Sequence, residues 1–212
     1  MSFRPDTTYN VGSSPRSVIA ADVNGDGYMD LICANALTNT LSVLTNNGNG
    51  VFGSNATYTV GYEPYWVIAT DVNNDGKLDL VCANRDNTLS VLTNDGNGNF
   101  TLACTPQAGS AGEPSVVAAD VNGDGHWDLI CTSTGNNTMS VLVSVPTLAI
   151  NSSGNDTLVS WPSFWTNWVL QQNFDLTTTN WSTNAGIVDN GMKKSLTITP
   201  PADNSFFRLQ HP

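Results

Sequence analysis

A nine-residue pattern that occurs three times, 49 positions apart, constrains this chain more than any other feature. The copies read DVNGDGYMD from Asp22, DVNNDGKLD from Asp71 and DVNGDGHWD from Asp120. Each places carboxylate or carboxamide oxygens at positions 1, 3, 5 and 9, and a glycine at position 6. Ca²⁺ takes six to eight oxygen ligands at roughly 2.3–2.6 Å, and a glycine lets the backbone turn sharply around the ion. The pattern therefore predicts one calcium site in each of the three copies.

The charge of the chain points the same way. Its formal net charge is −11, although only 12% of its residues are charged, and nine of the 18 acidic residues are the Asp of the three copies. Three bound Ca²⁺ would reduce the formal charge to −5, so the acidity is local and indicates cations. The seven Lys and Arg are scattered, which argues against nucleic acid and anionic membranes as partners.

No apolar run approaches the roughly 20 residues of a membrane span. The first residues, MSFRPDTTYN, lack the apolar stretch of a signal peptide. A cytoplasmic protein and a mature secreted chain are both compatible with this start. Because calcium sites of micromolar to millimolar affinity make sense outside cells, we expect an extracellular or cell-surface protein.

The self-similarity extends beyond the nine residues and predicts four short strands in each period. Asn-Gly and Asp-Gly turns separate the apolar segments, and no stretch has a sustained helical period. We expect the fourth strand around residues 58–60, with an equivalent at 9–11. Such a four-stranded unit, repeated every 40–50 residues or so, is typical of propeller blades. The first strands are expected at 18–20, 67–69 and 116–118.

The cysteines do not form a disulfide pattern. Cys33, Cys82 and Cys131 occupy one position of the repeat, and equivalent positions are usually too far apart for a bridge, which needs Cα atoms within about 7 Å. We expect each to be a small buried core residue, and Cys104 to be structural as well.

These features resemble the FG-GAP/VCBS repeat family, known from integrin α-subunit propellers and many secreted bacterial proteins. The resemblance covers about residues 3–145, and the family pattern D-x-N-x-D-G-x-x-D is complete in all three copies. It implies that each loop joins the innermost strand of a blade to the second strand. It also implies ligand sets of four side chains plus the carbonyl oxygen of position 7. These sets are Asp22, Asn24, Asp26, Tyr28 and Asp30; Asp71, Asn73, Asp75, Lys77 and Asp79; and Asp120, Asn122, Asp124, His126 and Asp128.

Two other interpretations of the loops were weighed. An EF-hand shares the D-x-N-x-D-G start but needs a bidentate Glu at position 12, where this chain has Cys33, Cys82 and Cys131. Loops that are only Asx-turns without an ion remain an alternative. Against it, nine unneutralised Asp in three tight loops would repel one another.

Three blades are fewer than the four to eight of known propellers. After Val143 the third repeat reads Ser144-Val145-Pro146 in place of the Asn-Gly turn. An open stack of blades leaves unpaired sheet edges. Two copies could pair into a six-bladed ring, the chain could be a fragment of a longer propeller, or the C-terminal segment could cover the open face. We favour the homodimer.

The remaining residues differ in composition, which divides the chain into blades at 1–145 and a second module at 146–212. The second part has no calcium pattern and holds four of the six Trp. Short apolar runs at roughly 10-residue spacing predict a small antiparallel sandwich-like β-module. Its aromatic residues could form a sugar-binding platform or the core of the module. We favour the core, with Trp165 as the exposed exception.

Nothing in the chain indicates catalysis, so we expect no enzyme. Of the two His, His126 lies in the third loop and His211 is the penultimate residue, and neither has the partners of a nucleophilic site. Motifs for hydrolases, metalloproteases and phosphate loops are missing from the sequence. Outside the loops the only repeated acids are Glu63 and Glu113, each before a proline.

In the blade order of the family, these Glu-Pro segments lie on the face opposite the calcium loops, near the axis. Such a rim is where propellers hold ligands, although ordinary exposed loop residues would look similar. We predict a calcium-binding interaction or adhesion module with a protein or glycan ligand; a lectin and a non-catalytic part of a polysaccharide-active enzyme are the alternatives. The predicted ligand-binding residues are Arg16, Tyr62, Glu63, Tyr65, Trp66, Arg85, Asp86 and Glu113.

Overall fold

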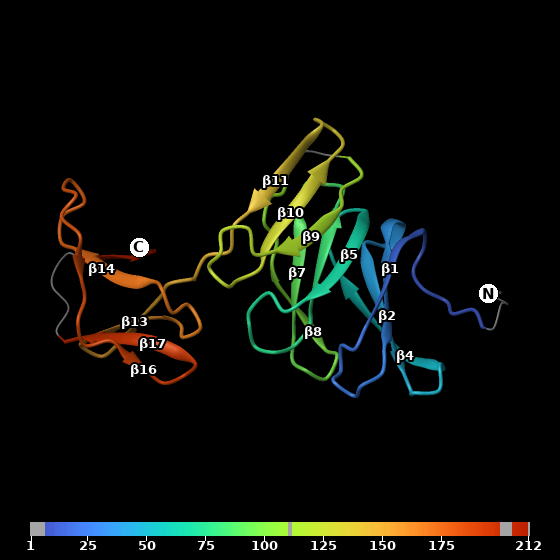
Figure 1. Cartoon of the computed structure of the whole chain (residues 1–212), viewed down its shortest axis with the longest axis horizontal. Helices are drawn as coiled ribbons and strands as arrows, with labels where there is room; N and C mark the ends of the chain where they lie inside the picture. The colour runs from blue at the N-terminus through green and yellow to red at the C-terminus, as the bar shows by residue number, and fades with distance from the viewer. Residues whose placement is uncertain (1–6, 110–111, 200–204, 212) are drawn as a thin grey trace. The chain divides into compact units, whose positions relative to one another are not determined.

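The chain folds into antiparallel β-sheets that belong to two compact units, Met1–Ser144 and Val145–Pro212 (Figure 1). The computed structural model describes residues 7–109, 112–199 and 205–211, and within them it contains one 3₁₀ turn, Ala36–Thr38, but no α-helix. Over this described part, no helix has the length and apolar character needed to cross a membrane. None of the sheets closes on itself.

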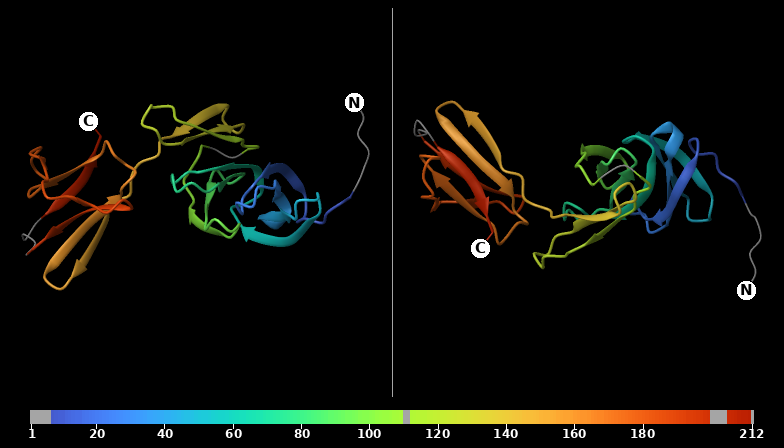
Figure 2. Two further views of the ribbon diagram at one scale, coloured as in Figure 1. Left: turned by 60° about the horizontal axis from the view of Figure 1, so that its bottom comes forward. Right: turned by 90° about the horizontal axis from the view of Figure 1, so that it is seen from above.

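The first unit consists of three sheets, one for each copy of the repeat (Figure 2). In each sheet, strands that are consecutive in the sequence are neighbours, because tight turns allow only antiparallel hairpins. The first sheet contains β1 (Pro15–Ala21), β2 (Asp30–Asn35), β3 (Thr40–Asn46) and β4 (Phe52–Thr59). The second contains β5 (Pro64–Thr70), β6 (Asp79–Asn84), β7 (Leu89–Asn94) and β8 (Phe100–Cys104). The third contains β9 (Val116–Ala119), β10 (Asp128–Ser133) and β11 (Thr138–Leu142).

Each sheet packs one face on the next sheet. The first strands carry these contacts, because β1 contacts β5 and β5 contacts β9. Between the first two sheets, Ile32 and Leu41 pack in one core with Val67 and Leu80. Alternate residues of the second sheet, such as Leu89, face the other way, into a core shared with the third sheet. The middle sheet is therefore covered on both faces, which explains why β6 is buried along its whole length.

The predicted strand positions are confirmed with two differences. Residues 58–59 belong to β4, but the equivalent segment at 9–11 is not a strand, so that prediction was wrong. Residues 9–11 do resemble residues 58–60 in sequence. The first sheet, however, takes its fourth strand from β4, which pairs with β3. The third sheet has three strands, because Pro146 and its neighbours replace the turn that leads to a fourth.

The second unit also builds its own core. Its sheets are ordered β12-β13-β17-β16 and β15-β14-β18. Side chains from both sheets, including Val159, Leu170 and Leu196, form one cluster with Trp161. The first sheet contains β12 (Ala149–Ser153), β13 (Asp156–Pro162), β16 (Val188–Asp189) and β17 (Lys193–Ile198). The second contains β14 (Val169–Asn173), β15 (Ser182–Thr183) and β18 (Phe206–Gln210).

Most aromatic residues of the second unit, among them Trp161 and Trp168, pack in its core, as favoured above, whereas Phe174 is 56% exposed. The prediction that Trp165 is exposed was wrong. Its side chain is only 6% exposed. Its ring meets that of Trp168 edge-on at a centroid distance of 5.9 Å, and its carbonyl oxygen accepts a hydrogen bond from Lys194 Nζ at 3.0 Å. Polar neighbours in the sequence did not decide burial, because the contacts that cover Trp165 come from other parts of the unit.

Cys33, Cys82 and Cys131 are buried free thiols, which confirms their predicted role in the core. Burial raises the pKa of the Cys82 thiol far above its usual range. Cys104 is also a free thiol but lies at the surface.

The stacked cores make a simple prediction about stability. Leu80→Ala removes a fully buried side chain from the first core and should lower the free energy of unfolding by about 2–5 kcal/mol. Leu37→Ala is the matched control, since Leu37 is largely exposed, and its effect should stay within about 0.5 kcal/mol. Urea denaturation of both variants measures the difference. Equal effects would contradict the packing described here.

Candidate functional site: the acidic loops and the rim cluster

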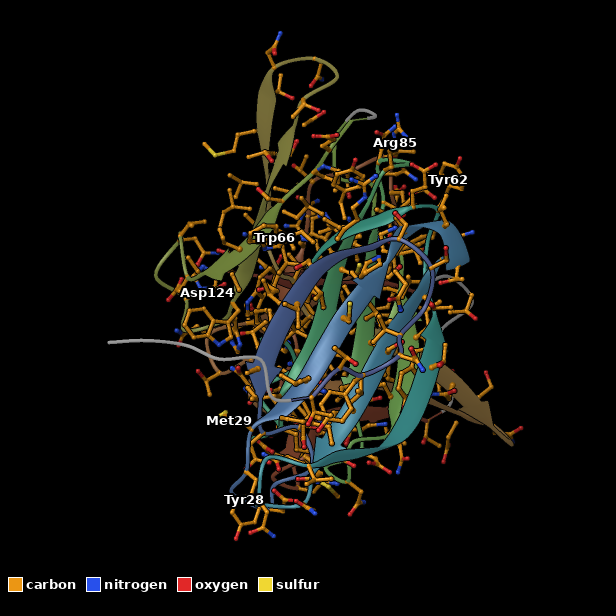
Figure 3. The ribbon with its side chains drawn as sticks, turned by 90° about the vertical axis from the view of Figure 1, so that its right-hand side faces the viewer. Tyr28, Met29, Tyr62, Trp66, Arg85 and Asp124 are labelled. Atoms are coloured by element: carbon orange, nitrogen blue, oxygen red, sulfur yellow. The ribbon has the colours of Figure 1, made fainter. Side chains whose placement is uncertain are left out.

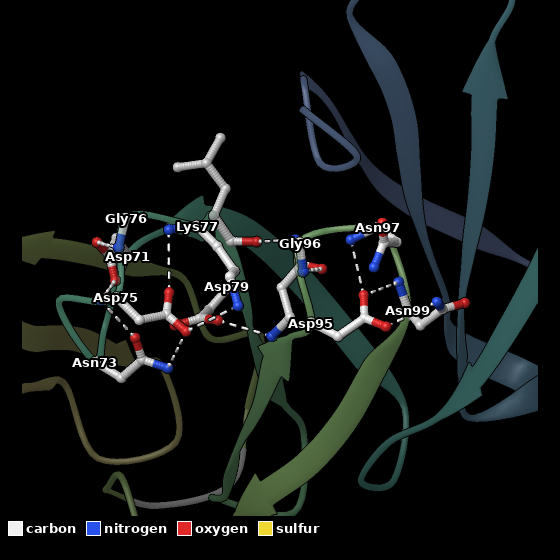
Figure 4. A network of polar contacts seen from close by, with 12 residues as sticks. Asp71, Asn73, Asp75, Gly76, Lys77, Asp79, Asp95, Gly96, Asn97 and Asn99 are labelled. Atoms are coloured by element: carbon white, nitrogen blue, oxygen red, sulfur yellow. Dashed lines mark hydrogen bonds and ion pairs between the residues drawn. The ribbon is translucent and has the colours of Figure 1, made fainter. Parts of the chain in front are cut away.

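The three nine-residue patterns form loops that join the first strand of each sheet to the second. We call them the acidic loops: loop 1 (22–30), loop 2 (71–79) and loop 3 (120–128). In loop 2, Asp71 Oδ2 accepts a hydrogen bond from the Gly76 N–H at 2.8 Å, and Asp75 Oδ1 accepts one from the Lys77 N–H at 3.0 Å (Figure 4). The Asn73 side chain accepts from the Asp75 N–H at 2.9 Å. The side chains at positions 1, 3 and 5 thus organise the backbone of their own loop.

The same bonds recur in the other two loops. The bond from the position-6 N–H to the position-1 carboxylate measures 2.8 Å in loop 1 and 2.9 Å in loop 3. The position-6 residues Gly27, Gly76 and Gly125 have φ values of +88°, +82° and +83°. Residues other than glycine seldom adopt this conformation, so the conformation accounts for the glycine that the pattern requires.

The ninth residue of each loop has a different environment. Asp30, Asp79 and Asp128 are completely buried where the second strand begins. One carboxylate oxygen accepts from the N–H of loop position 2, at 3.1 Å in all three copies, and the other accepts from an N–H just beyond or at the end of the third strand, at 2.8–2.9 Å. Each of these carboxylates therefore connects its loop to the end of the third strand of the same sheet. The donors are Val23 and Asn46, Val72 and Asn94, and Val121 and Ser144.

Loop 2 concentrates negative charge around its buried carboxylate. Burial raises the pKa of Asp79 to about 6; the N–H groups of Asn94 and Val72 oppose this shift, and the charges of Asp75 and Asp71 add to it. The three carboxylates are therefore close enough to repel one another.

The donor chemistry of the loops fits Ca²⁺, which prefers carboxylate, amide and carbonyl oxygens. A carboxylate oxygen that accepts one N–H retains a lone pair for a cation. Within the described residues, no three Asp, Glu, His or Cys side chains lie close enough together to hold a metal by themselves. Binding therefore needs the Asn side chain and the position-7 carbonyl, and it requires the loop to draw its oxygens together.

Neighbouring loops are linked to each other. Asn94 Nδ2 donates to the carbonyl oxygen of Val23 at 2.7 Å and to that of Leu78 at 2.8 Å, which joins loop 1 to loop 2. His126 Nδ1 lies 2.8 Å from Asn74 Nδ2, which joins loop 2 to loop 3. The sequence pattern predicted a role only for the carbonyl oxygen of His126 and none for Asn94. The recurrence of Asn46 and Asn94 at the end of the third strand was the signal that could have found the latter.

The predicted ligand-binding residues, which we call the rim cluster, come from all three sheets. The contacts below join all of them except Trp66, which lies on β5 at a distance from Tyr62 and Arg85 (Figure 3). The Arg16 guanidinium lies 5.0 Å from the centre of the Tyr65 ring, and Tyr65 OH donates to Glu113 Oε1 at 2.8 Å. Arg16 belongs to the first sheet, Tyr65 to the second, and Glu113 immediately precedes the third. The rim cluster therefore crosses both boundaries between sheets.

A second part of the rim cluster surrounds Glu63. Arg85 Nη1 lies 2.5 Å from Glu63 Oε2. The hydrogen bond from Arg85, together with a weaker effect of the hydrogen bond from Tyr62, holds the pKa of the Glu63 carboxyl below its usual range. The Tyr62 N–H donates to Asp86 Oδ2 at 3.1 Å. Trp66 and Tyr62 both present large exposed aromatic surfaces. Figure 3 places Tyr62 and Arg85 at the end of the first unit opposite Tyr28 of loop 1.

Stacked antiparallel sheets of three or four strands, each with an acidic loop after its first strand, define a repeat protein. A model of the FG-GAP-like repeat matches residues 22–82 and, overlapping them, residues 71–131. These residues make up more than half of the chain, which therefore belongs to the FG-GAP-like repeat family.

Other comparisons add less. No curated protein sequence matches the chain. Among solved structures, the crystal structure of the V. cholerae biofilm matrix protein Bap1 is similar with a TM-score of 0.29 and 14% sequence identity. The similarity covers 93% of this chain and 50% of the Bap1 chain, so this chain spans half the length of that structure.

In the absence of calcium, replacing the buried Asp of loop 2 should lower the free energy of unfolding more than replacing an exposed Asp of the same loop. Asp79→Ala leaves the N–H groups of Val72 and Asn94 without their acceptor, which should cost about 1–3 kcal/mol for each N–H. Asp75→Ala, at an exposed position of the same loop, should change the free energy of unfolding by at most about 0.5 kcal/mol. Chemical denaturation in EDTA compares them, and a larger effect at Asp75 would contradict the assignment.

Proposed function

We propose that the first unit is a calcium-binding, non-catalytic interaction module of a secreted or cell-surface protein. The observation that carries this proposal is the threefold recurrence of one loop in which a buried carboxylate sits next to exposed carboxylates. A single acidic loop has many explanations. Three copies with the same hydrogen bonds, in a family whose pattern they complete, support a common ligand.

The ion, when bound, supplies the positive charge that the loop lacks. In loop 2 the residues that would hold it are Asp71, Asn73, Asp75 and Asp79, with the carbonyl oxygen of Lys77. The side chains of Asp71, Asn73 and Asp75 already accept hydrogen bonds from backbone N–H groups of the loop. Binding to the folded state alone stabilises it by RT ln(1 + [L]/Kd) for each site.

The three sheets are proposed to be consecutive blades of a β-propeller. Contacts of β1 with β5 and of β5 with β9 support this, since they place the first strands side by side as the innermost strands of blades. The acidic loops then lie at one end of the blades, in line with the family pattern. The rim cluster lies near the axis at the other end.

The rim cluster is the proposed ligand-binding face. Aromatic residues and Arg are the residue types enriched at protein interfaces, and the cluster contains Tyr62, Tyr65 and Trp66 with two Arg. The ion pair of the cluster, between Arg85 and Glu63, is partly exposed and contributes little to stability, which favours a role in recognition. A protein or a glycan would suit this surface, and a glycan ligand would make the module a lectin.

Calcium should raise the melting temperature of the protein, and EDTA should reverse the effect. At a calcium concentration 100 times the Kd, each site contributes about 2.7 kcal/mol. Asp75→Asn should show a smaller increase in melting temperature with calcium, because the substitution removes a negatively charged ligand from loop 2. Asp95→Asn is the control, since Asp95 lies in the turn next to loop 2 but outside the pattern. An equal response to calcium in both variants would count against the site.

Ligand binding should depend on the rim cluster. Trp66→Ala should reduce binding to any glycan or cell-surface protein identified on arrays at least tenfold, whereas Leu102→Ala, at an almost equally exposed side chain (47% against 46%), should not. Arrays probed with and without EDTA show whether the rim needs calcium. Retained binding by Trp66→Ala together with lost binding by Leu102→Ala would place the ligand elsewhere.

A further inference from the structure

The first and third sheets each expose apolar residues at positions that are buried in the other sheets. On the first sheet the exposure is local to Val18, because Cys33, Ser42 and Leu44 on the same face are already buried. Val18, Val67 and Val116 occupy one position of the first strand in the three sheets. Val67 and Val116 are fully buried against the preceding sheet, whereas Val18 is 65% exposed. We call the face of the first sheet that carries Val18 the leading face.

We call the face of the third sheet that points away from the second sheet the trailing face. It carries exposed apolar residues at positions that the first two sheets bury. At one position of the third strand, Leu41 and Leu89 are 0% and 1% exposed because the following sheet covers them, whereas Met139 is 68% exposed. Val141 and Val117 on the same face are also more than half exposed. The first and second sheets bury such apolar residues against the sheet that follows. The third sheet keeps them, although no further sheet of the first unit covers them.

The strand that the third sheet lacks has a counterpart in the segment before β1. The sequence TYNVG at 8–12 matches TYTVG at 57–61. Tyr58 of β4 stacks edge-on against Phe100 at 5.3 Å and donates to the Gly98 carbonyl at 3.1 Å. Tyr9 does the same with Phe52 at 5.4 Å and the Gly50 carbonyl at 3.3 Å.

The segment 7–11 therefore lies on the first sheet as a fourth strand of a preceding sheet would. The segment itself is not assigned to any strand. Within the residues that the structure describes, β11 is an edge strand of the third sheet, and no strand pairs with its outer side. Each feature supplies what the other lacks.

We propose that the trailing face of one chain docks on the leading face of a second copy, whose residues 7–11 join β11 as its fourth strand. The pairing of β3 with β4 gives the register, because Leu41 lies opposite Tyr58 and Ser42 opposite Thr57. Met139 would then face Tyr9 of the partner subunit, and Ser140 would face Thr8 of the partner subunit.

A second copy is the occupant that satisfies both faces at once. Each chain offers one leading and one trailing face, so two chains related by a two-fold axis make two identical contacts and leave neither face exposed. The resulting six sheets lie within the four to eight blades of propellers. The proposal depends on the stacking of the sheets and not on calcium, so it stands or fails independently of the metal sites.

The mass of the full chain in solution tests the proposal first. Light scattering should give twice the 22.5 kDa of one chain in both calcium and EDTA, with dissociation on dilution. Val141→Lys, which places a charge on the trailing face, should give the monomer. Leu176→Lys, at an exposed residue of the second unit, should remain a dimer. A monomeric wild-type chain at high concentration would overturn the proposal, as would a dimer that Val141→Lys leaves intact.

Cross-linking tests the register. In a Cys104→Ser background, one chain carrying Ser140→Cys is mixed with another carrying Thr8→Cys and oxidised, so that only pairing between chains gives a covalent dimer. The mixture should cross-link, whereas Ser140→Cys mixed with Thr101→Cys should not. Equal cross-linking of the two mixtures, or none in either while the dimer persists, would overturn the proposed strand addition.

Discussion

The buried carboxylate that ends each acidic loop is the interaction on which the first unit depends. Asp79 has both oxygens bonded to backbone N–H groups, one in its own loop and one at the end of β7. A buried carboxylate deprived of such partners costs several kcal/mol, so the loop and the third strand must keep their positions together. The charges of the exposed Asp71 and Asp75 add to the raised pKa of Asp79, because they repel its ionised carboxylate. A bound cation would relieve this repulsion.

The parts of the fold that could be predicted from the sequence are those set by local pattern. The loops, their glycines and most strands follow from the 49-residue period, because each period contains its own turns. The predictions for residues 9–11 and Trp165 failed for a different reason. Whether a segment pairs, or a ring is covered, depends on distant partners, and a local pattern does not contain them. The ring of His126 was overlooked because its partner, Asn74, belongs to another copy.

The repeats also separate two tasks in space. The acidic loops are linked to one another through Asn94 and His126. The contacts of the rim cluster run from Arg16 through Tyr65 to Glu113 and span the same three sheets, and Tyr62 and Arg85 lie at the end opposite Tyr28 of loop 1. Because both sets of contacts cross the boundaries between sheets, anything that fixes the stacking also fixes the surface offered to a ligand.

Each of the three equivalent loops is proposed to close around one divalent cation. Calorimetric titration of the metal-free protein with Ca²⁺ tests this most directly, because it counts the ions. The account predicts three Ca²⁺ per chain, and two after the position-1 and position-5 Asp of any one loop are replaced by Asn. A wild-type protein that takes up no Ca²⁺ at millimolar concentration would show that the loops are self-contained turns and would contradict it.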